Sequence, residues 1–224
     1  MENVVIIGNG RMAKHLSHWC ELLNIKVTHW HRSQGVALNL QNIDSIWLAI
    51  SDNALVSFFE TLKPKLSGQK VVHFSGTVHH PEMIAAHPLM TFSYDLYDLA
   101  IYNKIYFGLT GVETLSEALP GFKNSFFKIA PSDKPLYHAL CVTTGNLPQL
   151  LWSETLPQFA DLKIPQEAVK HFAQQSLTNF FAAGPAAVTG PIVRKDTTTI
   201  EKNLSALEKV NLKLKNIYQS FLQG

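Results

Sequence analysis

The stretch VVIIGNGRMA at residues 4–13 constrains the fold of this chain more than any other. Its first four residues are an uninterrupted β-branched run, which predicts a short strand buried on both faces, as in the middle of a parallel sheet. Two glycines follow closely, and apolar residues recur at helical spacing from Met12 to Leu23. A strand that passes through a glycine turn into a helix is a typical opening of an α/β fold.

Strands and helices continue to alternate as far as residue 131. A helical pattern covers residues 53–66. Short apolar runs predict strands at 25–30, 43–50, 71–74, 85–92, 105–111 and 126–130. Short strand–helix–strand units of this kind predict a doubly wound parallel sheet with crossover helices.

Only helices are predicted in the rest of the chain. The first covers residues 136–162 and is interrupted at Pro148 and Pro157. We therefore expect an α/β domain over residues 1–131 and an all-helical domain over residues 132–224.

The last two predicted helices carry apolar faces. One opens at Pro165, and the other begins near Thr198, where Glu201 three residues later suggests a capping box. A long apolar stripe then runs from Ile200 to Phe221. With the aromatic residues of the preceding helix, it offers more apolar surface than a helical half of this size needs, which predicts a homodimer through the helical domain. The alternative is that the helices bury all of this surface against each other.

The composition limits the partners. The formal net charge is only +2, so neither nucleic acid nor an anionic membrane is expected as the main partner. No apolar run reaches the roughly 18 residues of a membrane span, and no cationic region precedes the first strand as in a signal peptide. Cys20 and Cys141 make no metal or redox spacing and indicate a reducing cytoplasm. His29 and His31 share a strand face without further ligands, so no metal site is predicted.

The glycine loop follows the pattern G-x-G-x-x-A. Gly8 allows a tight turn, Gly10 lets the backbone approach a pyrophosphate, and Ala13 lets helix and strand pack closely. A phosphate would lie at the positive end of the helix. The residues predicted to bind the dinucleotide here are Gly8, Asn9, Gly10, Arg11, Met12 and Ala13. The alternative is an ordinary strand–helix turn that binds nothing.

A second cofactor signal follows the next predicted strand. Folds that bind NAD usually carry an acid about 20 residues after the glycine loop, but no acid lies between Glu21 and Asp44. Arg32 and Ser33 lie there instead, and a guanidinium and a hydroxyl can hold a 2′-phosphate. This favours NADP(H) over NAD(H), with His31 as a neighbour of the adenine. The alternative is a loop arginine that faces water.

Polar residues also end the third and fourth predicted strands. Ligands of open parallel sheets lie at the carboxyl ends of strands. The candidates for the ribose and nicotinamide side are therefore Ser51, Asp52, Ser75 and Gly76. Asp52 could equally be the N-cap of the following helix.

Six motifs occur in order along the chain: GNGRMA at 8–13, HRS at 31–33, SD at 51–52, HFSG at 73–76, HPLMTF at 87–92 and GPIVRKD at 190–196. Together they resemble a family of Rossmann-like proteins classed as NADP-dependent oxidoreductases, with a C-terminal helical domain of unknown function. Relatives of that family are ketopantoate reductase, pyrroline-5-carboxylate reductase and the 6-phosphogluconate dehydrogenase group.

The resemblance implies a nicotinamide cofactor in the first domain and a helical second domain that closes the cleft and commonly builds a dimer. It implies no particular substrate. The chain departs from the family where members usually read Arg-Gly-Asp, since it has Arg194-Lys195-Asp196. It also has Pro148 close after Asn146, where an uninterrupted helix is expected.

Four residues are candidates for contact with a substrate. His87 lies where a predicted strand ends at a proline, and the ordinary pKa of histidine suits proton donation near neutral pH. Asn146 could bond a substrate carbonyl or the nicotinamide carboxamide, and Arg194 could grip a substrate carboxylate. Asp196 is either a further substrate contact, a helix cap or a partner of that arginine. The structural alternatives for the others are a histidine bonded across a turn and polar surface residues.

The sequence thus favours an NADP(H)-dependent reductase that acts on a small, anionic carbonyl or imine substrate. One alternative is a regulatory or scaffold module that binds NADP(H) without turnover. Another is a structural dimer whose glycine loop is empty.

Overall fold

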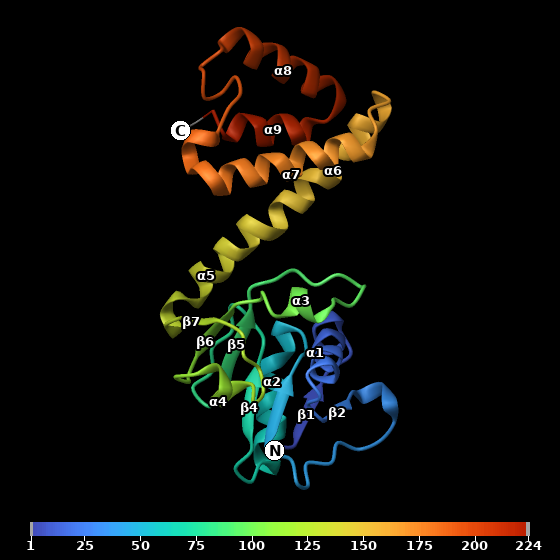
Figure 1. Ribbon diagram of the computed structural model, residues 1–224, viewed down its shortest axis with the longest axis vertical. Coiled ribbons are helices and arrows are strands. Elements are labelled where there is room, and N and C mark those ends of the chain that lie inside the picture. The colour runs from blue at the N-terminus through green and yellow to red at the C-terminus, as the bar shows by residue number, and fades with distance from the viewer. Residues whose placement is uncertain (1, 223–224) are drawn as a thin grey trace. The chain divides into compact units, whose positions relative to one another are not determined.

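The structure is a computed structural model and describes residues 2–222. Its contacts divide the chain into two compact units, Met1–Gly145 and Asn146–Gly224. The first contains a seven-stranded sheet with flanking helices (Figure 1), and the regular structure described in the second is helical. This confirms the predicted fold class. The predicted functional boundary after residue 131 stays a prediction.

The sheet has the strand order β2-β1-β3-β4-β5-β6-β7. The strands are β1 (Val4–Ile7), β2 (Val27–Trp30), β3 (Ser45–Leu48), β4 (Lys70–His73), β5 (Ile84–Pro88), β6 (Phe107–Thr110) and β7 (Phe126–Lys128). The five strands from β2 to β5 pair in parallel, as expected of a doubly wound sheet. The last two strands run in the opposite direction, because β6 pairs antiparallel with β5 and β7 is parallel to β6.

The sheet separates two hydrophobic clusters. Alternate residues of β1 point to opposite faces and join different clusters. Helix α1 (Arg11–Leu22) packs on one face with α3 (Leu99–Tyr102) and α4 (Leu115–Ala118), and α2 (Asp52–Leu62) packs on the other. All four residues of β1 are at most 2% exposed, which confirms a strand buried on both faces.

The helix predicted over residues 136–162 is interrupted at a different place. A π-helical turn at Val142–Asn146 joins α5 (Lys134–Cys141) to α6 (Leu147–Asp161). Pro148 lies in the first turn of α6, where its missing N–H costs no helical hydrogen bond. Pro157 lies inside α6, so the interruption predicted there is wrong.

The helical unit ends with shorter helices than expected. After α7 (Gln166–Ala183), the last predicted helix is divided into α8 (Thr197–Val210) and α9 (Leu212–Ser220). The division falls at Asn211, whose side chain accepts a hydrogen bond at the start of α9 and so begins a new helix. The prediction of one continuous helix with an apolar stripe from Ile200 to Phe221 is therefore wrong.

Candidate functional site

The glycine loop between β1 and α1 has the geometry that its sequence pattern predicts. Gly8 has a φ of +143°, and a Cβ at this position would lie 2.2 Å from the carbonyl oxygen of Ala49. Only glycine fits this turn without displacing backbone. Ala13 is fully buried against it, 3.5 Å from the same Cβ position.

Gly10 matters for a different reason. It is the N-cap of α1, with a φ of −78°, and apart from Gly10 and its two chain neighbours no heavy atom lies within 4 Å of its Cβ position. The space above it is therefore open, directly where the first N–H groups of α1 have no partner within the helix. Backbone N–H groups and the helix dipole favour an anion at such a place.

The other residues of the loop differ in their surroundings. Asn9 is exposed beside the open space, whereas Met12 is half-buried and packs on the core. The guanidinium of Arg11 lies 3.3 Å from the carbonyl oxygen of Phe92 and 5.2 Å from the ring centre of Tyr94. Arg11 thus connects the loop to the segment around residues 92–94.

The strand order reverses beside β1, because β2 lies on one side of it and β3 on the other. At such a switch point the carboxyl ends of the strands border a crevice that binds ligands. The glycine loop follows β1 and Ser51 follows β3, so both lie at this edge of the sheet. Ser51 is the N-cap of α2, and Asp52 is in its first turn. The alternative that Asp52 is the N-cap is therefore wrong.

Arg32 and Ser33 begin a 3-10 turn, Arg32–Gln34, directly after β2. Both side chains are exposed, and Arg32 makes no side-chain hydrogen bond or ion pair with any residue that the structure describes. The end of β2 is tied to the glycine loop, because Nε2 of His29 lies 2.6 Å from the carbonyl oxygen of Gly8. The predicted adenine neighbour, His31, packs edge-on against His29 with 5.7 Å between ring centres.

A second group of polar residues lies at the carboxyl ends of β4 and β5. A Cβ on Gly76 would lie 2.6 Å from the ring of His138 and 3.1 Å from Nε2 of His87. Glycine therefore leaves room for both imidazoles. On the other side of its ring, Nδ1 of His87 lies 2.8 Å from the hydroxyl of Tyr137.

Sequence reasoning missed Lys134, the first residue of α5. This lysine is 0% exposed, and its Nζ donates a hydrogen bond to the carbonyl oxygen of Ser75 at 3.1 Å. The hydroxyl of Ser75 accepts the N–H of Val78 at 3.0 Å, so it holds the turn after β4. The available signal was the spacing of polar residues along α5, with Lys134, Tyr137 and His138 at positions that share one helix face.

Burial changes the protonation of this group. It lowers the pKa of His87 to about 4, with the charges of His138 and Lys134 acting in the same direction. It lowers the pKa of His73 to about 3, again aided by Lys134. Burial also lowers the pKa of Lys134 to about 8, against the opposing effect of Asp52. Both imidazoles are therefore neutral at pH 7, and the expectation that His87 has an ordinary pKa is wrong.

The remaining candidates belong to the second unit. Asn146 ends the π-helical turn, and Arg194 lies in the turn before α8; both are exposed. Asp196 is the N-cap of α8 and accepts the N–H of Thr199 at 3.0 Å and its hydroxyl at 2.7 Å. The capping box predicted at Thr198 is therefore wrong, since the cap lies two residues earlier.

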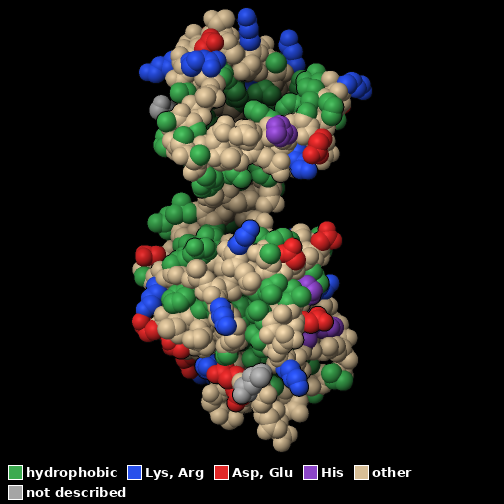
Figure 2. Space-filling view, in the orientation of Figure 1, with side chains coloured by type: hydrophobic (Ala, Val, Ile, Leu, Met, Phe, Trp, Pro, Cys, Tyr) green, Lys and Arg blue, Asp and Glu red, His purple; other side chains and the backbone are tan. Residues whose placement is uncertain are grey.

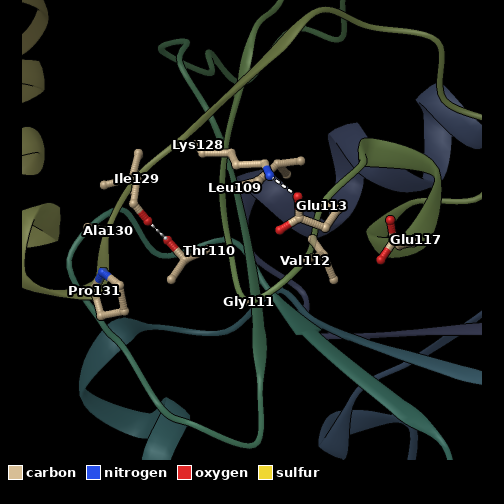
Figure 3. A pocket seen from close by; sticks show the side chains of 10 residues that line it. All are labelled: Leu109, Thr110, Gly111, Val112, Glu113, Glu117, Lys128, Ile129, Ala130 and Pro131. Carbon is tan, nitrogen blue, oxygen red and sulfur yellow. Dashed lines mark hydrogen bonds and ion pairs between the residues drawn. The ribbon is translucent and has the colours of Figure 1, made fainter.

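A cavity of about 490 Å³ lies at the opposite edge of the sheet (Figure 3). It borders the carboxyl end of β6, where Thr110 pairs with Ala85 at the start of β5. Its polar groups bond each other: the hydroxyl of Thr110 donates to the carbonyl of Ile129 at 2.8 Å, and Lys128 forms an ion pair with Glu113. None of the predicted site residues lines it.

Three further observations concern residues 2–222. No group of three His, Cys, Asp or Glu side chains in this range could hold a metal ion. None of the helices described is long and apolar enough to cross a membrane. Cys20 and Cys141 are both free thiols.

Comparison with known sequences identifies the family. The family model for a domain of unknown function, DUF2520, matches residues 105–223, more than half of the chain. The chain belongs to the DUF2520 family. No curated protein matches its sequence.

Solved structures place this DUF2520 protein in a fold group. A Bacteroides fragilis protein with the provisional name NADP oxidoreductase is 16% identical with a TM-score of 0.75, and the alignment covers 100% of this chain and 98% of that one. A Thermotoga maritima protein has a TM-score of 0.67 at 16% identity, with 98% of each chain covered. The pyrroline carboxylate reductase of Plasmodium falciparum, solved with NADP bound, has a TM-score of 0.62 at 12% identity, with both chains covered completely.

At these identities the likeness shows the fold alone. That fold is the Rossmann-like one of nicotinamide-dependent reductases with a helical C-terminal domain. The family resemblance predicted from the six sequence motifs is thereby confirmed.

Proposed function

We propose that this protein is an NADP(H)-dependent reductase of a small, anionic carbonyl or imine substrate. The observation that carries the proposal is the open space above Gly10, at the N-terminus of α1 and at the switch point of the sheet. A pyrophosphate fits there because the helix N-terminus offers unpaired N–H groups to an anion. A nicotinamide held there would supply the hydride, and the protein would orient the substrate and donate hydrogen bonds to it.

Arg32 and Ser33 select NADP(H) in this proposal. The guanidinium is exposed, has no partner in the described part of the chain, and follows the strand that is tied to Gly8. It can therefore hold a 2′-phosphate through charge and paired hydrogen bonds. The other predicted contacts of the dinucleotide are Asn9, Gly10, Ser51 and Asp52.

His87 is the hydrogen-bond donor to the substrate in this proposal. Its imidazole is neutral at pH 7, so it offers one N–H and no positive charge. Its Nε2 is directed to Gly76, and the backbone of Ser75 and Gly76 forms the predicted nicotinamide side.

In the second unit, Asn146 and Arg194 are exposed and can offer an amide and a guanidinium to a ligand. We assign the substrate carboxylate to Arg194. The carboxylate of Asp196 is used as a helix cap, so we assign it the support of the turn that carries Arg194.

Thermal unfolding with added nucleotide tests the proposed function. A ligand that binds only the folded protein raises the melting temperature, so we expect NADPH at millimolar concentration to stabilise the wild type. Gly10→Ala should stay folded and lose most of this stabilisation, because its Cβ would occupy the phosphate space. Stabilisation by neither NADPH nor NADH would refute the proposal.

The role of Arg32 is tested by the ratio of NADPH to NADH affinities. Loss of a charge-assisted bond to the 2′-phosphate should lower this ratio about tenfold or more in Arg32→Ala. Lys26→Ala, which removes another exposed cation near β2, is the matched control. An unchanged ratio in Arg32→Ala would show that the arginine does not choose the cofactor.

The main alternative is a module that binds NADP(H) without turnover. It is favoured by the two histidines near Gly76, because burial lowers the pKa of His87 to about 4 and that of His73 to about 3, which removes both as proton donors at pH 7. Loss of NADPH absorbance with small oxo-acids and imino-acids distinguishes the two. Turnover that persists in His87→Ala would remove His87 from the reaction.

We also propose a homodimer through the helical unit and a cytoplasmic location. Among residues 146–222 only Leu214 is buried, while Figure 2 shows hydrophobic side chains at the surface of this unit. Phe172 and Phe181 of α7 are 69% and 74% exposed. Many large exposed apolar side chains on one unit favour a protein contact. The two free cysteines support the reducing compartment.

A further inference from the structure

Helix α5 has the reverse of the side-chain distribution expected at a surface. Lys134 is 0% exposed, whereas Leu136 and Leu140 are 65% and 57% exposed. Tyr137 and His138 lie on the same helix face as Lys134 and contact His87. A surface helix normally buries its apolar face and exposes its lysines. The inward face of α5 therefore presents polar and titratable side chains where a surface helix normally presents apolar ones.

Lys134 accounts for most of this departure. An ammonium has three donors, and the described residues give it one hydrogen-bond acceptor, the carbonyl oxygen of Ser75. Asp52 is the carboxylate that acts on it electrostatically, and it forms no ion pair with Lys134 in the described structure. A buried charge without an ion pair is unfavourable for folding. If this side chain only filled space, a methionine or leucine at position 134 would make the folded protein more stable.

We propose that Lys134 is a positioning residue of the reductase site, where it holds the Ser75–Gly76 turn against His87. The contact between Lys134 and Ser75 does not depend on the proposed function, but the role that we assign to Lys134 rests on that function. Ser75 is bonded on both sides: its carbonyl accepts from Lys134, and its N–H lies 3.2 Å from Nδ1 of His73. Lys134 therefore fixes the peptide that leads into Gly76.

The same lysine acts on the protonation of His87. The groups that face this imidazole are His73 from β4 and Lys134, Tyr137 and His138 from α5. The positive charge of Lys134 adds to burial in keeping the ring neutral. Burial also raises the pKa of Tyr137, so its phenol stays protonated and can donate to Nδ1. When the phenol donates to Nδ1, the proton of the neutral ring is on Nε2, next to Gly76.

Three substitutions separate the hydrogen bond from the charge. Lys134→Met removes both, Lys134→Gln keeps a donor without charge, and Lys134→Arg keeps both. The readouts are the NADPH dissociation constant, from a fluorescence titration, and the titration of the His87 ring signals by NMR in the nucleotide-free protein. Lys123→Met, at an exposed position in the same unit, is the control.

We expect Lys134→Met to weaken NADPH binding about tenfold and to move the His87 titration to higher pH. Lys134→Gln should move the titration in the same direction and largely keep the affinity, and Lys134→Arg should resemble the wild type. A wild-type affinity and titration in both Met and Gln variants would overturn the proposal, as would equal changes in Lys123→Met.

Two outcomes are distinguished by the design. If Lys134→Met does not fold, as judged by circular dichroism, the Gln and Arg variants decide the case by the same two readouts. If the wild type binds neither NADPH nor NADH, the proposed function fails. The titration of His87 in the variants then decides by itself whether Lys134 acts on that ring.

Discussion

Two glycines in one loop are required for different physical reasons. Gly8 has a backbone conformation and a contact with Ala49 that exclude any side chain, so it serves the fold. Gly10 has an ordinary conformation and open space around it, so the fold does not require glycine there, and its proposed role is to admit a ligand. The G-x-G pattern alone predicts both glycines, but only the structure separates their roles.

Gly8→Ala should destabilise the protein by about 3 kcal/mol or more, because strain at positive φ adds to a backbone clash. Gly68→Ala is a matched control, since Gly68 has a φ of +106° but no heavy atom within 4 Å of its Cβ position. It should cost about 1 kcal/mol, from strain alone. Urea unfolding measures both, and equal losses would contradict the role given to Ala49.

His73 should make the protein less stable in acid. Its pKa is about 3 in the folded protein and 6.5 in the unfolded chain, so the unfolded state binds the proton first as the pH falls. Stability is complete above about pH 6.5 and declines toward pH 3, by about 1.4 kcal/mol per pH unit for one group. In His73→Asn, which keeps an acceptor for the N–H of Ser75, the slope should be smaller. An equal slope would show that His73 does not titrate in this way.

At the scale of elements, the helices show how far local signals reach. The spacing of apolar residues predicted α1 and α2 nearly to their ends, because both bury one face on the sheet. The helices of the second unit were predicted with less accurate limits. Asp196 and Asn211 begin α8 and α9 through side-chain caps, and both lie outside the apolar pattern that was used.

Asp196→Ala should destabilise the helical unit by about 1 kcal/mol, since it removes the N-cap of α8. Thr198→Ala lies within the same turn at an exposed position and should change the stability by less than about 0.5 kcal/mol. Equilibrium urea unfolding followed by circular dichroism compares the two. A larger loss of stability in Thr198→Ala than in Asp196→Ala would support the capping box that the sequence predicts at Thr198.

At the scale of the whole molecule, the two units bury their side chains very differently. The sheet unit has two closed hydrophobic clusters, whereas the described residues of the helical unit leave many large apolar side chains exposed. An isolated helical unit of this kind lacks the burial that offsets the entropy of folding. A second copy of the chain could supply it.

Sedimentation velocity at micromolar concentration should therefore show a dimer. Phe181→Asp, on the exposed face of α7, should shift the protein to monomer because a charge would be buried in the contact. Val36→Asp is the control, since Val36 is 61% exposed in the sheet unit. A monomeric wild type would exclude the proposed dimer.

Sequence patterns alone were enough for the strand–glycine–helix unit and for the succession of strands before the helices. Each of these depends on neighbours that are close along the chain. The motifs also led to the correct family, because their order extends over nearly the whole sequence.

The tertiary structure alone decided the state of the groups at the ends of β4 and β5. Lys134 meets Ser75 across 59 positions in the sequence, and His87 meets Tyr137 across 50. Whether a histidine is neutral or a lysine is buried depends on desolvation by such distant segments, which no local pattern encodes. The reversed direction of β6 and β7 was likewise decided by the tertiary structure, because an apolar run predicts a strand but not the direction in which it pairs with its neighbour.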